Sequence, residues 1–335
     1  MSSTRGKLLK LIVALILMGM TSTCFSYLGN RKHLSPGLTT SRSENNFAYV
    51  GQLIQKCGPL CVVSAGTFSP SLYFDRREVQ VDCKAIFDNT VFIQFGHGLS
   101  EAPRAIPANL LSDFTLGGKI QTSDYYFNKK YLTKTAETAI WSKELVSNMI
   151  TAASEGNLEG TYGISETNHL RSALKRAPGV KGGRVLVIGS ENPWVEACVL
   201  EAGAKSVVTL EYGTIHSEHS QISTLTPPEF QMQYISGKLG TFNAIVTFSS
   251  VEHSGLGRYG DALNPWGDIL EIARAHCVCE SHGSLVLAVM YGEDEIEYNA
   301  HRIYGPARWP YLATNWHQLY REQEGSQLVH VFQKE

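Results

Sequence analysis

The sequence lacks the features that mark several common classes of protein. Its 29 Lys and Arg residues are balanced by 31 Asp and Glu residues, and no run of basic residues is longer than two. A nucleic-acid-binding surface needs a local basic excess to contact phosphates, so no nucleic-acid partner is predicted. The metalloprotease motif His-Glu-x-x-His and the serine elbow Gly-x-Ser-x-Gly are also absent, which argues against both classes of hydrolase.

Metal-binding spacing is missing as well. Cys57 and Cys61 enclose a Gly-Pro pair, and Cys277-x-Cys279 is shorter than the usual zinc spacing. Structural zinc sites need ligand pairs that can converge on one tetrahedral ion. We therefore predict no metal site.

Long hydrophobic runs are absent except at the N-terminus. Arg5, Lys7 and Lys10 precede an apolar stretch over 11–20, and the six residues that follow are small and mostly polar. This order is typical of a signal peptide, whereas a membrane span needs roughly 20 apolar residues. Residues 1–28 are predicted to be a signal peptide or a signal anchor. The rest of the chain is then expected in the secretory pathway, secreted or anchored to the membrane through this segment alone.

The cysteine count fits an oxidising compartment. Cleavage near Ser26 would remove Cys24 and leave six of the seven cysteines, the even number expected of a disulfide-bonded protein. One candidate is a disulfide among Cys57, Cys61 and Cys83. Cys198 and Cys277 are instead expected to be core residues on helix faces.

The chain divides into regions of different regularity. Residues 29–50 are rich in Ser, Thr, Asn and Arg, which predicts a linker. Residues 51–160 form an N-terminal extension of unassigned fold. Short apolar runs such as 91–93 alternate there with turn signals, so short strands and loops are expected, followed by a helix over 135–153.

Strands and helices alternate through residues 161–335. Apolar runs predict buried strands at 184–188, 206–210, 242–248 and 285–289. Asn192-Pro193 and Asn264-Pro265 each place a cap residue and a proline at a helix start, and these helices are expected to end near 202 and 280, with an earlier helix at 166–177. The alternation predicts a doubly wound, Rossmann-like α/β fold with a mostly parallel sheet. Residues 317–321 and 327–332 predict a terminal antiparallel hairpin.

The first two strands of this region are followed by candidate cofactor-binding residues. Gly189, Ser190 and Glu191 form the first turn, and Glu211 and Tyr212 end the next strand, 22 residues after the glycine. Ligands bind at this edge of such sheets, and an acid at this separation can accept hydrogen bonds from ribose hydroxyls. Only one glycine of the dinucleotide fingerprint is present, so a nucleoside without phosphates, such as S-adenosylmethionine, fits better. The alternative is that Glu211 is a solvated acid.

The third strand is followed by Ser249, Ser250, Glu252 and His253, at the same edge of the sheet. Glu252 or His253 could act as a general base or orient a substrate hydroxyl. Adjacent side chains rarely point the same way, so the two are not expected to form a dyad. The alternative is that one packs in a loop and the other is solvated.

Two loops carry candidate substrate-binding residues. Arg258 and Tyr259 lie in the glycine-rich segment 255–261, which is predicted to be a mobile loop beside the pocket. Asn299, His301 and Arg302 lie between the last parallel strand and the hairpin, and Arg302 could hold a carboxylate or phosphate. The alternative for both segments is a structural connection.

Four strings carry a resemblance to known proteins: VLVIGSENPWVEACVLEAGA, VVTLEYG, FNAIVTFSSVEHSGLGRYGDALNPWGD and NAHRIYGP. Residues 162–334 resemble the class I S-adenosylmethionine-dependent methyltransferases, and more closely a family catalogued as domain of unknown function 268. The resemblance implies a seven-stranded sheet whose last two strands form the antiparallel hairpin. It also implies that residues 189–191 lie near the methionine part of the cofactor, that Glu211 contacts the ribose, and that 249–252 line the pocket. The glycine-rich first motif common in class I enzymes is reduced here to Gly189.

The sequence therefore predicts a methyltransferase-like protein of the secretory pathway. It would bind S-adenosylmethionine and transfer a methyl group to an oxygen or nitrogen of a small molecule or glycan, with His253 or Glu252 taking the proton. Two alternatives are a catalytically inactive binding or scaffold protein of the same fold, and a nucleotide-sugar or dinucleotide-dependent enzyme. The missing glycines disfavour the second alternative.

Overall fold

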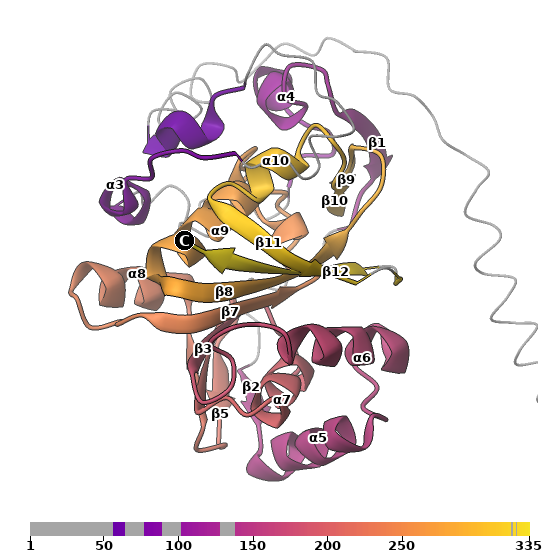
Figure 1. Cartoon of the computed structure of the whole chain (residues 1–335). Helices are drawn as coiled ribbons and strands as arrows, with labels where there is room; N and C mark the ends of the chain where they lie inside the picture. The colour runs from indigo at the N-terminus through magenta and orange to yellow at the C-terminus, as the bar shows by residue number, and fades with distance from the viewer. Residues whose placement is uncertain (1–55, 64–76, 89–101, 128–137, 323, 326) are drawn as a thin grey trace, which may run out of the picture. The chain divides into compact units, whose positions relative to one another are not determined.

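The structure is a computed structural model that describes residues 56–63, 77–88, 102–127, 138–322, 324–325 and 327–335 (Figure 1). The predicted signal segment at 1–28, the linker at 29–50 and the apolar run at 91–93 lie outside these residues. Within the described ranges, no helix combines the length and apolar character that a membrane crossing needs.

A seven-stranded sheet in the order β11-β12-β8-β7-β3-β4-β6 forms the centre of the fold. Its strands are β3 (Arg184–Ile188), β4 (Ser206–Leu210), β6 (Ile222–Leu225), β7 (Phe242–Phe248), β8 (Cys279–Met290), β11 (Trp316–Arg321) and β12 (Gln327–Lys334). Neighbouring strands from β6 to β8 are parallel, whereas β12 is antiparallel to β8 and β11. The predicted mostly parallel sheet and its terminal hairpin are confirmed.

Helices cover both faces of this sheet, as its strand sequences require. Val185 and Val187 face one core and Leu186 and Ile188 face the other, because successive side chains of a strand point to opposite faces. The first core contains residues of α5 (Lys143–Glu155), α6 (Gly163–Leu174) and α7 (Trp194–Glu201). The second contains residues of α8 (Pro227–Ile235), α9 (Gly267–Val278) and α10 (Trp309–Leu312). Figure 1 shows these two groups on opposite sides of the strands.

Several element boundaries differ from the predictions. The helix expected over 135–153 begins only at Lys143, because Ser142 caps it by accepting a hydrogen bond from the Leu145 N–H. Trp141 instead ends the short strand β2 (Ala139–Trp141), which pairs with β5 (Ile215–Ser217). The helix expected to reach 280 ends at Val278, and residues 279–283 belong to β8 because Cys279 pairs with the start of β7.

The described part of the N-terminal extension contains more helix than predicted. Its described residues up to Phe127 form the 3-10 helix η2 (Gly58–Cys61), the helices α3 (Cys83–Asp88) and α4 (Ala108–Phe114), and the strand β1 (Gln121–Tyr125). β1 pairs with β9 (Glu295–Asn299), which also pairs with β10 (His301–Ile303). A third apolar core joins these elements to α9.

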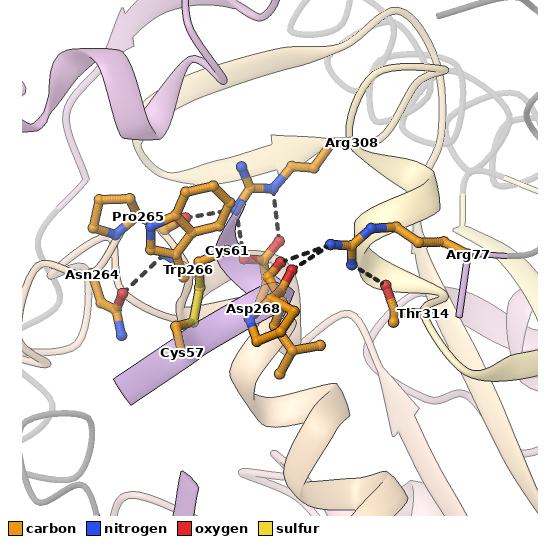
Figure 2. Close-up of a disulfide and its surroundings, with 11 residues drawn as sticks. Cys57, Cys61, Arg77, Asn264, Pro265, Trp266, Asp268, Arg308 and Thr314 are labelled. Carbon is orange, nitrogen blue, oxygen red and sulfur yellow. Dashed lines mark hydrogen bonds and ion pairs between the residues drawn. A yellow bond between two sulfur atoms is a disulfide. The ribbon is translucent and has the colours of Figure 1, made fainter. Parts of the chain in front are cut away.

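Two disulfides hold this extension. Cys57 pairs with Cys61, which confirms the predicted disulfide and places it beside Trp266 (Figure 2). Cys83 of α3 pairs with Cys277 of α9. Cys277 packs against the second core, as expected of a core residue on a helix face, and it also forms this disulfide, which the sequence did not predict.

Candidate functional site

A cavity of about 370 Å³ lies at the carboxyl ends of β3, β4 and β7. From β3 the chain runs outward through β4 and β6, and it then returns to place β7 on the other side of β3. Ligands of open α/β sheets bind in the crevice at such a reversal of strand order. The volume lies within the range of small-molecule pockets.

Most of the residues predicted for the site line this one cavity. They are Gly189, Ser190, Glu191, Glu211, Tyr212, Ser249, Ser250, His253, Arg258, Tyr259 and His301. Glu252, Asn299 and Arg302 do not line it, and all three are fully buried. The sequence thus located the cavity wall and misplaced some of the residues behind it.

The turn after β3 requires glycine at its first position. Gly189 has a φ of 73°, and a Cβ there would lie 1.7 Å from Ser250 Oγ. No side chain fits at that distance, and the conformation itself favours glycine. The loops after β3 and β7 therefore meet at this residue, at the base of the cavity.

Glu211 joins the ends of two neighbouring strands. Its Oε2 accepts a hydrogen bond of 2.7 Å from the Ser190 N–H, and its Oε1 accepts one of 2.6 Å from the Tyr212 N–H. Burial raises the pKa of this carboxyl, and the backbone N–H groups oppose that change. The Gly213 N–H acts on the same carboxylate, and a carboxylate has about four acceptor positions, so at least one remains for a ligand. The carboxylate is a fixed part of the cavity wall rather than a solvated acid.

A second carboxyl lies under the same turn and was not predicted. Glu196 of α7 is fully buried and accepts hydrogen bonds from Ser190 Oγ at 2.9 Å and Thr209 Oγ1 at 2.8 Å. Burial raises its pKa to about 7, although these hydrogen bonds lower it. The available signal was a glutamate inside the apolar stripe of α7, where a charge needs a partner.

A hydrogen-bonded chain leads from the cavity to Glu252. The Tyr162 hydroxyl donates to Ser249 Oγ at 2.7 Å, and Ser249 Oγ donates to Glu252 Oε1 at 2.7 Å. Burial raises the pKa of Glu252 to about 7, and the hydrogen bond from Ser249 opposes this. Tyr162 lines the cavity but was not predicted, because it lies in a glycine-rich break between two helices. The chain gives Glu252 an indirect connection to the cavity.

His253 lines the cavity directly, and its tautomer follows from its neighbours. Its Nδ1 lies 2.7 Å from the Ala300 carbonyl oxygen, which can only accept a hydrogen bond. Nδ1 therefore carries the proton, and Nε2 is the basic nitrogen of the neutral ring. The His301 ring lies 6.2 Å away, and burial together with Arg258 lowers its pKa to about 4. His301 is neutral at pH 7.

Aromatic side chains form a further wall of the cavity. The Phe248 ring packs edge-on against Trp194 with a centroid distance of 4.9 Å and lies 5.5 Å from the Tyr162 ring. Aromatic faces bind flat rings and cations. This wall stands beside the turn after β3, so a planar ligand can lie between the turn and the rings.

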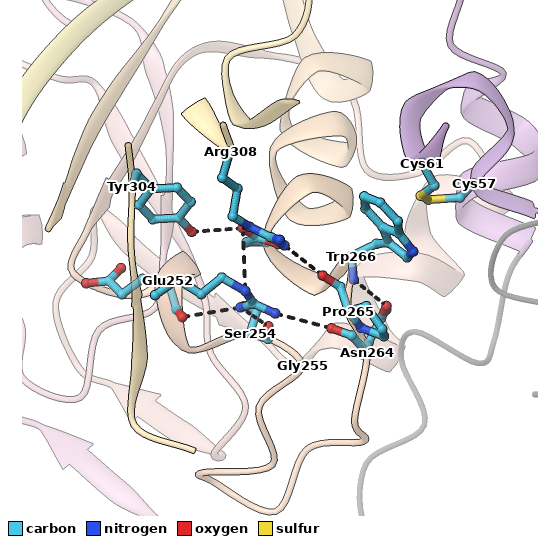
Figure 3. Close-up of polar contacts among 12 residues, drawn as sticks. Cys57, Cys61, Glu252, Ser254, Gly255, Asn264, Pro265, Trp266, Tyr304 and Arg308 are labelled. Atoms are coloured by element: carbon cyan, nitrogen blue, oxygen red, sulfur yellow. Dashed lines mark hydrogen bonds and ion pairs between the residues drawn. A yellow bond between two sulfur atoms is a disulfide. The ribbon is translucent and has the colours of Figure 1, made fainter. Parts of the chain in front are cut away.

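Two residues predicted to contact substrate are buried in contacts that hold the loops instead. Arg302 donates to the backbone carbonyls of Ser254 at 2.6 Å and Glu252 at 3.3 Å, two residues that are labelled in Figure 3. Asn299 accepts from the Phe127 N–H at 2.7 Å. A carboxylate or phosphate could not reach Arg302 without displacing these carbonyls. The buried position of Arg302 therefore does not allow the predicted contact with substrate.

Below Arg302 lies a buried ion network. Asp268 accepts two hydrogen bonds from the Arg308 guanidinium, at 2.7 and 2.8 Å, and one from the Tyr304 hydroxyl at 2.9 Å. Arg302 Nε lies 3.8 Å from the same carboxylate. Burial favours the neutral acid, but the two arginines outweigh it and lower the pKa of Asp268. The loop after β7 is thus tied to an ionised aspartate inside the protein.

A family comparison matches the part of the chain that forms most of the central sheet. Residues 182–330 match the family described as "Caenorhabditis protein of unknown function, DUF268". This match confirms the family resemblance predicted from the sequence. No curated protein matches the chain. Among the described residues, no group of three or more His, Cys, Asp or Glu side chains could hold a metal ion.

Solved structures with a similar chain course include several described as methyltransferases. A chain from the complex between the Haloferax volcanii Trm112 methyltransferase activator and the putative methyltransferase is 10% identical, with a TM-score of 0.36, covering 55% of this chain and 96% of that chain. A putative S-adenosylmethionine-dependent methyltransferase from Listeria monocytogenes is 9% identical, with a TM-score of 0.35, covering 51% and 98%. An O-methyltransferase family protein from Burkholderia thailandensis is 8% identical, with a TM-score of 0.37, covering 56% and 58%. The assignment of the fold rests on the strand order and directions described above.

Proposed function

We propose that this protein is an S-adenosylmethionine-dependent methyltransferase that acts on an oxygen or nitrogen of a small molecule or glycan. The observation that carries the proposal is the position of Glu211, hydrogen-bonded to the turn after β3 and facing the cavity at the reversal of strand order. A carboxylate at that point suits the two hydroxyls of a ribose. The match to an uncharacterised family leaves the acceptor open.

The residues present fit a nucleoside better than a dinucleotide. Gly189 allows the loops after β3 and β7 to meet, but no further glycine follows it to admit a pyrophosphate. Trp194 and Phe248 offer an apolar wall beside the turn, and aromatic faces attract cations such as a sulfonium. Both features support S-adenosylmethionine over NAD.

In the proposed reaction the bound cofactor supplies an electrophilic methyl group, and the protein positions the acceptor and removes a proton. Nε2 of His253 would take the proton from the acceptor oxygen or nitrogen, because Nδ1 is held protonated by the Ala300 carbonyl. Glu252 provides a second path, since a proton accepted by Tyr162 can pass through Ser249 to Glu252 Oε1. In both paths the chain contributes alignment and one base.

The secretory location is part of the same proposal. Two disulfides, one of them between the extension and α9, support folding in an oxidising compartment. N-terminal sequencing of the mature protein distinguishes a cleaved signal from an anchor. An intact Met1 on a protein purified from the cytosol would contradict both.

Calorimetric titration with S-adenosylmethionine and with NAD tests the cofactor. We expect saturable binding of the first and none of the second. If NAD binds instead, the dinucleotide-dependent alternative is correct. If neither binds, the protein is a methyltransferase-like binding or scaffold protein.

A further inference from the structure

The cavity is divided by charge. Glu191 and Glu211 line the cavity next to β3 and β4, and Glu271 lines it in an ion pair with Arg274, whereas Arg258 lies beside His253 and acts electrostatically on His301. Both histidines are close to the guanidinium, and His301 is neutral at pH 7 because its pKa is about 4. A cationic or hydroxyl-bearing ligand therefore suits the first side, and an anionic one suits the second.

We propose that the side of the cavity next to Arg258 binds the methyl acceptor through a carboxylate on that acceptor. The proposal rests on the proposed function, which gives the other side of the cavity to the cofactor. It assigns Arg258 as the residue that selects the acceptor by charge, and it places His253 beside the acceptor atom that receives the methyl group.

Arg258 is held in place before any ligand arrives. One guanidinium nitrogen, NH1, donates to the Ala300 carbonyl at 3.1 Å. The guanidinium also lies 4.6 Å from the Phe127 ring centroid and 5.2 Å from that of Tyr259. A guanidinium fixed by stacking and one backbone bond loses little freedom when it binds an anion, so more of the interaction energy remains for the ligand.

The charge of Arg258 has no counter-ion in the described part of the chain. No carboxylate of those residues lies within 4.0 Å of its guanidinium nitrogens, and its buried Nε has no hydrogen-bond partner there. Glu252 is the acid that interacts with it electrostatically, but Glu252 is fully buried and does not line the cavity. A guanidinium that lacks a carboxylate partner at a cavity wall favours an anionic ligand over a neutral one.

A carboxylate fits this side better than a phosphate. Arg258 is the one permanently charged cation among the described residues that line the cavity. It balances one negative charge, whereas a phosphate monoester carries about two near pH 7. The planar guanidinium also matches the two oxygens of a carboxylate. We therefore assign a carboxylate, such as that of a uronic acid or an aromatic acid.

The methionine part of the cofactor also carries a carboxylate, and the experiment must separate the two sources. Sinefungin has that amino-acid group, whereas methylthioadenosine has the same nucleoside without it. If Arg258 held the carboxylate of the cofactor, Arg258→Met would weaken the binding of sinefungin by tenfold or more and leave the affinity for methylthioadenosine unchanged. We expect both ligands to bind Arg258→Met as they bind the wild type.

The acceptor side is tested by titrating the intact, disulfide-bonded protein with matched pairs of probes: glucuronate and glucose, galacturonate and galactose, benzoate and benzamide. We expect at least one carboxylate to bind about tenfold or more tightly than its neutral partner, as one charge-assisted pair provides. Arg258→Met should abolish that preference. Arg176→Met should keep it, because Arg176 stacks on Tyr320 and does not line the cavity.

Two results would overturn the assignment. One is that no carboxylate is preferred over its neutral partner, and the other is a selective loss of sinefungin in Arg258→Met. If that variant fails to fold, Arg258→Lys replaces it, and a preference reduced by several-fold is expected because the lysine keeps the charge but not the planar fork. The probe titrations are run both in the presence and in the absence of sinefungin. A wild type that prefers carboxylates but never binds sinefungin would contradict the proposed function and leave Arg258 as an anion site.

Discussion

The two sides of the cavity are held by different kinds of contact. On the β3–β4 side, Glu211 accepts hydrogen bonds from backbone N–H groups that lie within two adjacent strand ends. On the β7 side, the loop that carries His253 is held by Arg302, and Arg302 lies beside the buried Asp268. The first side depends on short local bonds at the sheet edge, and the second on a charge network inside the protein. Substitutions should therefore weaken binding on the first side and destabilise the fold on the second.

The largest effect is expected from Asp268→Ala. The change leaves Arg302 and Arg308 buried without their carboxylate, and removing one partner of a buried ion pair costs about 3–5 kcal/mol. Urea unfolding measures the loss. Glu155→Gln, at the exposed end of α5, is the control and should change stability by less than about 0.5 kcal/mol.

The pH dependence of this effect has a definite sign. Because the pKa of Asp268 is lowered in the folded protein, its contribution is complete above the usual pKa of an aspartate and is lost as the pH falls below it. The difference between wild type and Asp268→Ala should shrink in acid. An equal difference at pH 3 and pH 7 would contradict an ionised Asp268.

The two disulfides of the N-terminal extension also differ in range, one being local and the other long-range. Cys83–Cys277 closes a segment with a sequence separation of 194, and Cys57–Cys61 one with a separation of only 4. Loss of the long-range bond should cost about 2–5 kcal/mol. We expect Cys83→Ser with Cys277→Ser to lower the unfolding midpoint in urea more than Cys57→Ser with Cys61→Ser. The reverse order would show that α3 does not support α9.

The local side of the cavity is also the side that the sequence could predict. The apolar runs of β3, β4 and β7 predicted those strands, because a strand buried on both faces is apolar throughout. Since the carboxyl ends of parallel strands lie at one edge of the sheet, Gly189 and Glu211 were predicted to lie close together. Each of these inferences needs only one segment and the rule that parallel strands end at one edge. The short strand pair β2–β5 has no comparable apolar run, so it was missed.

The residues behind the second side could not be found in this way. Arg302 contacts Ser254 and Asn264 across at least 38 residues of sequence, and nothing in its local pattern separates a buried arginine from a substrate-binding one. Tyr162 reaches Ser249 from the break before α6. Such contacts arise from tertiary packing, which neither periodicity nor motif spacing encodes.

One buried carboxyl on each side gives a matched pH test. Glu196 lies under the β3 turn and Glu252 behind the β7 loop, and burial raises the pKa of each to about 7. A raised carboxyl pKa means that the folded state binds the proton more tightly, so stability is full below about pH 4.5 and falls as the pH rises toward 7. At 1.36 kcal/mol per pKa unit the fall is roughly 3 kcal/mol for each group.

Replacing either residue by glutamine should reduce that fall. Glu196→Gln and Glu252→Gln are each expected to lose less stability than the wild type between pH 5 and pH 8 in urea unfolding. The double variant should lose the least, because the two groups lie in different cores. A wild-type stability that is constant over this range would contradict both raised pKa values.

The smallest effect is expected on the local side, at Glu211. Glu211→Gln keeps one carbonyl oxygen for the backbone N–H of Ser190 or Tyr212, so the unfolding free energy should fall by only about 1–3 kcal/mol, the cost of one unsatisfied donor. The substitution replaces one carboxylate oxygen with an amide nitrogen and removes the negative charge, so the charge-assisted hydrogen bonds from the ribose hydroxyls are lost. Such bonds contribute about 1.5–3 kcal/mol each. Sinefungin and methylthioadenosine, which share the ribose, should both bind about tenfold or more weakly by calorimetry. Glu155→Gln, at the exposed end of α5 and away from the cavity lining, is the control and should bind both ligands as the wild type does. Equal affinities for Glu211→Gln and wild type would remove Glu211 from the ribose and with it the observation that carries the proposed function.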